Sequence, residues 1–178
     1  MAAYRIVKDH LVTVSPLNPN ESAQIGQQSS RGIEASLGLT ISPTLRVDAN
    51  AAVLRAKFDD YSESTGLGTA SRDGNVPTDV PQRLANLWIS WRFQPAWSGS
   101  VGMKHVGKRF ADAANQLSMG SYTTLDAALA WQVRSDTTLT ARVFNMFNRR
   151  YIETAYYDQT QWLVGNDRRL EVVLNHRF

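Results

Sequence analysis

Two stretches near the end of the chain, TTLTARVFNMFNRRY (137–151) and RRLEVVLNHRF (168–178), decide the predicted fold. In the second stretch apolar and mostly polar positions alternate, which is the two-residue period of a β-strand with one apolar face. The apolar positions are Leu170, Val172, Leu174 and Phe178, with His176 interrupting them. The chain stops on this strand with an aromatic residue, although chain ends usually fray into water.

A final apolar strand that ends in an aromatic residue is typical of outer-membrane β-barrels, where aromatic side chains lie at the membrane interface. We expect about eight up-and-down strands of roughly ten residues in an all-β, antiparallel transmembrane barrel portion. The expected strands are 4–14, 30–41, 45–55, 83–93, 97–110, 123–133, 139–147 and 168–178. The alternation is poor in 4–14, which we interpret as an edge strand.

Short and long connections alternate between these strands. The short turns are 42–43, 94–96 and 134–136, and the long loops are 15–26, 60–81, 111–120 and 152–166. This asymmetry predicts periplasmic turns and extracellular loops. Four large aromatic residues lie beside the turns, where an aromatic girdle is expected: Trp91, Phe93, Trp97 and Trp131.

Polar side chains mostly occupy the alternate positions opposite the apolar face: Glu34, Arg46, Asp48, Asn86, Arg92, Lys104, Asp126, Arg142, Glu171 and Arg177. Charge is tolerated toward a wet lumen and is costly toward lipid. A soluble lipocalin-like barrel or a β-sandwich has the reverse arrangement, with the apolar side inside. Alternation alone does not distinguish the two, and the terminal Phe178, the tryptophans and the loop asymmetry favour the membrane barrel.

Composition narrows the alternatives further. The chain has 178 residues, a net charge of +3, five tryptophans and no cysteine, which excludes disulfides and thiolate metal sites. The charges are scattered singly, so no nucleic-acid patch is expected. There is no long apolar run for a transmembrane helix and no secretory signal at the N-terminus. Since an outer-membrane protein must be exported, either a signal has been removed or the chain is part of something longer.

The segment FNMFNRRY (144–151) resembles the N-L-F-[DN]-x-x-Y segment near the end of TonB-dependent outer-membrane receptors. The family continues with a loop, a Gly-x-x-Arg-like element, here Gly165–Arg168, and a final strand ending in Phe, here Phe178. Further similarity lies in SSRGIEASL (29–37), VPQRLANLWISWRF (80–93), VGMKHVGKRFADAAN (101–115) and SYTTLDAALAWQV (121–133). His176 departs from the family, which usually has Tyr or another bulky apolar residue there.

The resemblance covers nearly the whole chain and belongs to the siderophore-receptor branch. It implies that residues 1–178 are the C-terminal segment of a plugged barrel of about 22 strands. Such a receptor binds a ferric siderophore and imports it with energy transmitted by the TonB complex, which contacts an N-terminal region without a counterpart here. It also implies contact with outer-membrane lipid, and a final strand read by the barrel-assembly machinery through Leu170, Val172, Leu174 and Phe178.

Candidate ligand residues lie in the last loop, because scaffolds carry function on loops. Arg149, Arg150, Tyr156 and Tyr157 offer cations and aromatic faces to an anionic, ring-bearing iron chelate. In the competing interpretation Tyr151 and Trp162 belong to the girdle and the other tyrosines are loop packing. The three histidines, at positions 10, 105 and 176, lack metal-ligand spacing, and no hydrolase motif occurs, so neither an enzyme nor a resident cofactor is expected.

An autonomous eight-stranded outer-membrane barrel of structural or adhesin type is the main alternative, because eight is the minimum bacterial strand number. It requires strand 4–14 to close on strand 168–178.

Overall fold

The computed structural model describes residues 1–14, 20–65, 68–156 and 161–178, and the regular structure of these residues is β. Eight long strands pair into one sheet: β1 (Ala2–Val14), β2 (Ser22–Ser42), β3 (Leu45–Asp60), β6 (Arg83–Gln94), β7 (Trp97–Val106), β10 (Tyr122–Arg134), β11 (Thr137–Phe144) and β14 (Arg169–His176). Short strands pair into three hairpins: β4 (Ser62–Thr65) with β5 (Gly68–Ser71), β8 (Arg109–Phe110) with β9 (Ser118–Met119), and β12 (Ile152–Tyr156) with β13 (Gln161–Val164).

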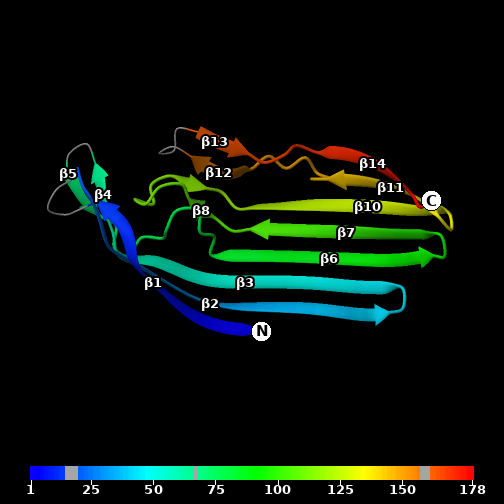
Figure 1. The fold of residues 1–178 in the computed structure, drawn as a ribbon, viewed down its shortest axis with the longest axis horizontal. Coiled ribbons are helices and arrows are strands. Elements are labelled where there is room, and N and C mark those ends of the chain that lie inside the picture. Colours follow the sequence, from blue (N-terminus) through cyan, green and yellow to red (C-terminus); the bar gives the residue numbers. More distant parts are fainter. Residues whose placement is uncertain (15–19, 66–67, 157–160) are drawn as a thin grey trace.

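The sheet is an antiparallel meander with the order β1-β2-β3-β6-β7-β10-β11-β14. Tight turns join the long strands at the right-hand end of Figure 1, and the small hairpins lie toward the left. We call these the turn end and the loop end. The eight strands predicted from alternation are therefore confirmed.

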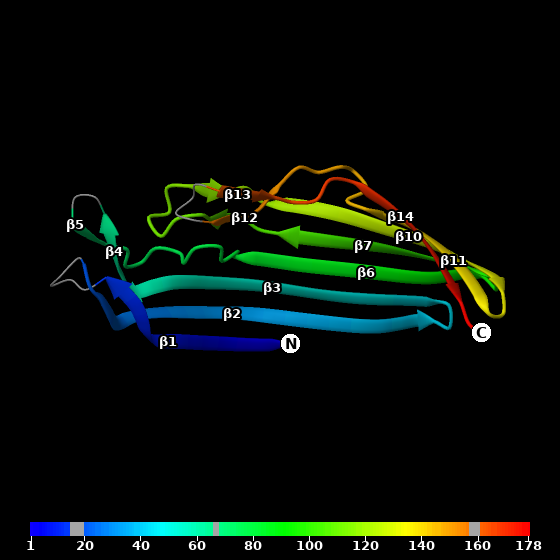
Figure 2. The same cartoon turned by 45° about the horizontal axis from the view of Figure 1, so that its top comes forward.

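The sheet is open. Strands β1 and β14 lie at opposite edges (Figures 1 and 2), and among the described residues they pair with β2 and β11 alone. The prediction of an edge strand at 4–14 is confirmed. Closure of β1 on β14, which the autonomous-barrel alternative requires, does not occur in this structure.

Several predicted boundaries were wrong. The expected loop 15–26 overlaps β2, which begins at Ser22, while residues 15–19 lie outside the described ones. The three other expected loops contain the small hairpins or parts of them. The expected strand 97–110 is divided into β7 and β8. Strand β11 ends at Phe144 because Asn145 has a positive φ of 47°, so Phe147 does not extend the apolar face.

The apolar side chains of the sheet form one continuous face. Val47 lies opposite Leu39 and Ile89, and Ile89 also lies opposite Val101. These side chains remain uncovered, with Val53, for example, 58% exposed. Beside the turns, Trp97 stacks on Trp131 with ring centroids 5.5 Å apart. An apolar surface this extended, edged by aromatic rings, is what lipid covers.

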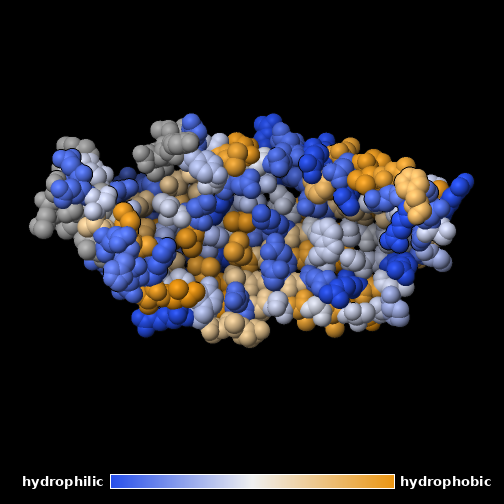
Figure 3. All heavy atoms as spheres, viewed as in Figure 1, coloured by the Kyte–Doolittle hydropathy of each residue, from blue (hydrophilic) through white to orange (hydrophobic). Residues whose placement is uncertain are grey.

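The other face of the sheet is polar. The register places on it the residues predicted to face inward, including Glu34, Arg46, Asp48, Asn86, Arg92, Lys104, Asp126, Arg142 and Glu171. Asn86 donates to Asn50 at 2.9 Å, and Arg142 pairs with Glu171 at 3.0 Å. In the view of Figure 3, hydrophilic and hydrophobic groups are mixed over the middle strands, without a continuous apolar band.

Candidate functional site

The most enclosed part of the described chain is the loop end, not the sheet. A single curved layer has no interior of its own, so buried side chains gather where the loops pack over the strand ends. They include Phe58, Val106, Arg109, Ala111, Asp112, Ala113, Met119, Tyr122 and Asn145. We call the loops at this end, between 61 and 82, 107 and 121, and 145 and 168, the loop cluster.

Arg109 lies inside the loop cluster and is 6% exposed. Its Nη1 donates to Asp79 Oδ1 and to the carbonyl of Glu153, both at 2.6 Å. Its Nη2 donates to the carbonyl of Ile152 at 2.8 Å. The guanidinium group also lies 5.7 Å from the centroid of the Tyr122 ring. One side chain therefore connects β8 with the loop before β6 and with β12.

Asp79 completes this connection. Its second carboxylate oxygen accepts a hydrogen bond from Thr154 Oγ1 at 2.8 Å, and its backbone N–H donates to the carbonyl of Phe110 at 2.9 Å. Asp79 has a φ of 61°, a left-handed conformation that Asp adopts more readily than most residues. All three loops of the cluster thus meet at Asp79 and Arg109.

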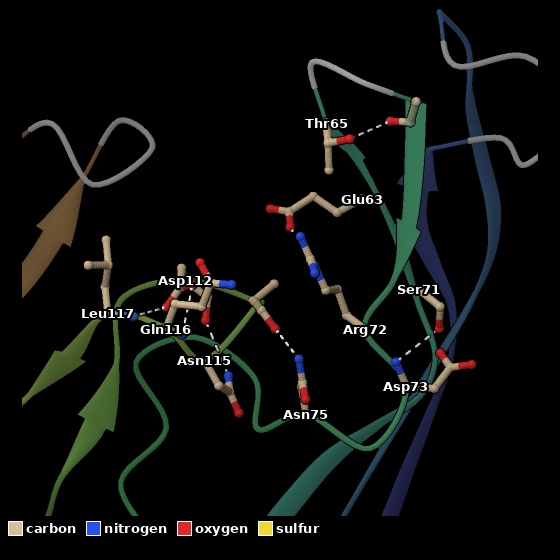
Figure 4. A network of polar contacts seen from close by, with 12 residues as sticks. Glu63, Thr65, Ser71, Arg72, Asp73, Asn75, Asp112, Asn115, Gln116 and Leu117 are labelled. Atoms are coloured by element: carbon tan, nitrogen blue, oxygen red, sulfur yellow. Dashed lines mark hydrogen bonds and ion pairs between the residues drawn. The ribbon is translucent and has the colours of Figure 1, made fainter.

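A second network joins the first two loops (Figure 4). Asn115 Oδ1 accepts from the backbone N–H of Val76, and Asn115 Nδ2 donates to the carbonyl of Val76, both at 2.8 Å. Asn75 Nδ2 donates to the carbonyl of Ala113 at 2.9 Å. The carboxylate of Asp112, which is buried, accepts from two backbone N–H groups of the turn that follows it. These contacts hold the loops against each other through backbone groups.

Tyr151 packs within the loop cluster. Its ring stacks on Tyr122 with centroids 3.9 Å apart, and a Cβ atom on Gly165 would overlap the Tyr151 ring. Burial, with a further contribution from the carboxylates of Glu153 and Asp126, raises the pKa of the Tyr151 phenol. This packing argues against the competing interpretation that placed Tyr151 in an interfacial girdle.

The segment FNMFNRRY and the element Gly165–Arg168 are joined by hydrogen bonds. Asn145 Nδ2 donates to the carbonyls of Arg149 and Asn166, each at 2.9 Å, and Asn145 Oδ1 accepts from the N–H of Arg149. Asn148 Oδ1 accepts from the N–H of Arg168 at 2.8 Å. The asparagines of this motif thus fasten β11 to the start of β14.

The predicted ligand residues lie apart from one another. Arg149 and Arg150 are exposed in the connection between β11 and β12. Tyr156 is 51% exposed at the far end of β12, roughly 13 Å further along the strand. Tyr157 lies outside the described residues. The structure therefore places the two arginines and Tyr156 in one loop but at opposite ends of β12.

The polar face carries a hollow of about 760 Å³ at the turn end. Arg46, Trp88, Asp126 and Arg142 are among the residues that line it. A Cβ atom on Gly102 would overlap the Trp88 ring, so this glycine lets the indole lie against β7. Sequence reasoning did not single out Trp88 or Arg109. The alternation could have placed Trp88 on the polar face, whereas nothing in the sequence pairs Arg109 with its distant partners.

The predicted assembly residues of the last strand are exposed on the apolar face, at 77% for Leu170, 70% for Val172 and 65% for Leu174, and Phe178 follows the strand. His176 interrupts this face but has a partner, since its Nδ1 lies 2.9 Å from Thr137 Oγ1 on β11.

Neither a metal-binding cluster nor a membrane-spanning helix occurs among the described residues. No group of three or more His, Asp and Glu side chains in this part of the chain is arranged to hold a metal ion. None of the described segments is a helix long and apolar enough to cross a membrane.

A curved meander with an apolar face, a polar face, tight turns at one end and packed loops at the other is a portion of an outer-membrane β-barrel. The family model "TonB dependent receptor-like, beta-barrel" matches residues 1–146, and the chain belongs to this family. The family is located in the bacterial outer membrane and consists of receptors and transporters, not enzymes. The turn end is therefore periplasmic and the loop end extracellular.

Curated relatives are longer proteins. The metal-pseudopaline receptor CntO of Pseudomonas aeruginosa is 26% identical over 184 residues, which cover 100% of this chain and 25% of the receptor. The ferrichrome outer membrane transporter/phage receptor of Escherichia coli is 25% identical over 87% of this chain and 21% of its own length. The chain thus spans about a quarter of the length of the curated relatives it matches.

Solved structures show the same fold. The siderophore receptor PiuA from Acinetobacter baumannii superposes with a TM-score of 0.87 at 21% identity, over 97% of this chain and 25% of PiuA. BauA, the ferric preacinetobactin receptor of the same species, gives a TM-score of 0.75 at 25% identity, over 98% of this chain and 26% of BauA.

Proposed function

We propose that residues 1–178 form the C-terminal barrel segment of an outer-membrane receptor that binds ferric siderophores and imports them with TonB-transmitted energy. The observation that carries this proposal is the open sheet with its polar face and linked extracellular loops. The sheet matches about a quarter of the length of longer receptors, among them one that is named as a siderophore receptor. The edge strands β1 and β14 each expose unpaired backbone groups, which further strands of a longer barrel would pair with.

The proposed ligand site is the extracellular loop that contains Arg149, Arg150, Tyr156 and Tyr157. The exposure of Arg149, Arg150 and Tyr156 supports it, because these side chains are free to meet a ligand from outside. Guanidinium groups attract an anionic chelate, and an aromatic face packs on its rings.

Two partners follow from the same proposal. The TonB complex would act through sequence outside these 178 residues. The barrel-assembly machinery would read the exposed apolar side of β14, formed by Leu170, Val172 and Leu174, together with the terminal Phe178. The lipid of the outer membrane would cover the apolar face.

Uptake of radioactive iron tests the function. The natural full-length protein is expressed in a strain without other siderophore receptors, and ferric catecholate, hydroxamate and carboxylate chelates are supplied in turn. The proposal expects uptake of one chelate class that disappears when TonB is deleted. It also expects weaker binding of that chelate by R149Q/R150Q than by R92Q/R134Q, which removes two turn-end charges. Absence of uptake for every class, with the protein folded in the membrane, would contradict the function.

The alternative of an autonomous eight-stranded barrel keeps one supporting observation, the even number of strands in the sheet. Heat-modifiable gel mobility of the 178 residues refolded in detergent separates the two. A compact band that shifts on heating would favour the autonomous barrel.

A further inference from the structure

A row of arginines crosses three neighbouring strands at one level. Arg5 on β1 lies directly opposite Arg31 on β2, and Arg31 lies directly opposite Arg55 on β3. Arg83 on β6 lies one diagonal position away, since it faces Val53. Facing residues of an antiparallel pair have Cβ atoms about 4.5–5.5 Å apart, so like charges directly opposite each other are unfavourable.

The row lies on the outer, apolar face. Arg31 and Arg55 are two residues beyond Ile33 and Val53, which face each other on that side of the sheet. Ten residues separate Leu45 at the turn end from Arg55, about 34 Å along a strand. At a tilt of about 40° this is about 26 Å of depth, close to the apolar band of about 25 Å in such barrels. The guanidinium groups therefore lie at the extracellular boundary of the lipid.

One acidic group, Asp59, lies beside the row and interacts electrostatically with Arg5. Lys57 pairs with Asp59 at 2.7 Å on the same face. Among the described residues, no carboxylate forms an ion pair with the guanidinium groups of Arg5, Arg31 or Arg55, and all three residues are exposed. Together with Lys57 and Asp59, they line one hollow of about 600 Å³, so four cationic side chains face one carboxylate there. This hollow has an excess of positive charge and space for an anion.

We propose that this arginine row binds the phosphate groups of an outer-leaflet lipid. Guanidinium groups bind phosphate oxygens bidentately, and several of them in one row suit a head group with two phosphates. The acyl chains of the same lipid would extend over Ile33 and Val53 on the adjoining apolar face. A soluble anion would gain the charge contacts but not this apolar contact. The proposal depends on the outer-membrane location and not on siderophore import.

Native mass spectrometry of the natural full-length protein in non-ionic detergent provides the test. The probes are diphosphoryl lipid A, monophosphoryl lipid A and phosphatidylcholine, with inorganic pyrophosphate as a soluble competitor. The main variant is R5Q/R31Q/R55Q. The matched control is R92Q/R134Q/R177Q, which removes the same number of charges from the turn end. Heat-modifiable mobility establishes that each variant is folded, and the single variant R31Q replaces the triple variant if the latter does not fold.

We expect tight binding of diphosphoryl lipid A, weaker binding of the monophosphoryl form, and unchanged binding by the control. At about fivefold per surface charge, the triple variant loses roughly 100-fold in affinity and R31Q about fivefold. Equal binding by the folded arginine variant and the control would overturn the proposal. So would equal affinity for the three lipids. Full displacement of the lipid by pyrophosphate at matched phosphate concentration would mean a site for free anions instead.

Discussion

Arg109 is the residue through which the extracellular loops are most directly connected. Arg109→Gln removes the guanidinium group that donates to Asp79 Oδ1 and to the carbonyls of Ile152 and Glu153, while Thr154 still donates to the other Asp79 oxygen. Losing hydrogen bonds from a buried charged donor costs about 1.5–3 kcal/mol, so local opening of the loop cluster should become about 30-fold more frequent. Amide hydrogen exchange of β8 and β12 measures this. Arg150→Gln, at an exposed position of the same loop, is the control, and equal exchange in both variants would contradict the role of Arg109.

Position 165 requires a glycine because the Tyr151 ring occupies the space of a Cβ atom there. Gly165→Ala places a methyl group where the Tyr151 ring lies, so the stack of Tyr151 on Tyr122 must shift. Overpacking of this kind costs about 1–3 kcal/mol. The near-ultraviolet circular dichroism of the tyrosines and the melting temperature should both fall. Gly120→Ala is the matched control, because a Cβ atom there meets no atom within 4 Å, and an equal effect at both sites would argue against the packing explanation.

At the scale of elements, neighbouring valines of β14 report which side of the sheet faces lipid. Val172 lies opposite Ala141 on the apolar face, while Val173 lies opposite Thr140 on the polar face. Val172→Arg should reduce the free energy of unfolding by about 2–4 kcal/mol near mid-depth, and Val173→Arg by much less, because a lumen tolerates charge. Urea unfolding of the natural full-length protein in lipid vesicles measures the difference. A larger loss at Val173 would reverse the assignment of the two faces.

At the scale of the whole molecule, the two free edges predict that residues 1–178 do not close by themselves. Refolded in detergent, the 178-residue chain should give no compact band that shifts on heating, whereas the natural full-length protein should give one. The physical reason is that β1 and β14 each leave a row of backbone groups unpaired, and lipid cannot satisfy them. A heat-shifted band from the isolated segment would instead support the autonomous barrel.

The sequence alone determined the strands, their order and their two faces. A strand is a local pattern, so alternation in 83–93 predicted β6 closely and alternation in 30–41 predicted the second half of β2. The short turns predicted which strands pair. The resemblance in FNMFNRRY predicted the family. Boundaries failed where a single backbone conformation ended the pattern, as at Asn145 with its positive φ.

The loop cluster was decided only by the tertiary structure. Arg109 meets Asp79 from 30 positions away and Glu153 from 44, and Thr154 meets Asp79 from 75. No local period encodes such contacts, because they depend on which strand ends the sheet brings together. The arginine row is similar, since Arg5, Arg31 and Arg55 are unremarkable in the sequence and become neighbours through the register of three strands. Alternation is set by each strand separately, whereas the proximity of charges across strands is set by their pairing.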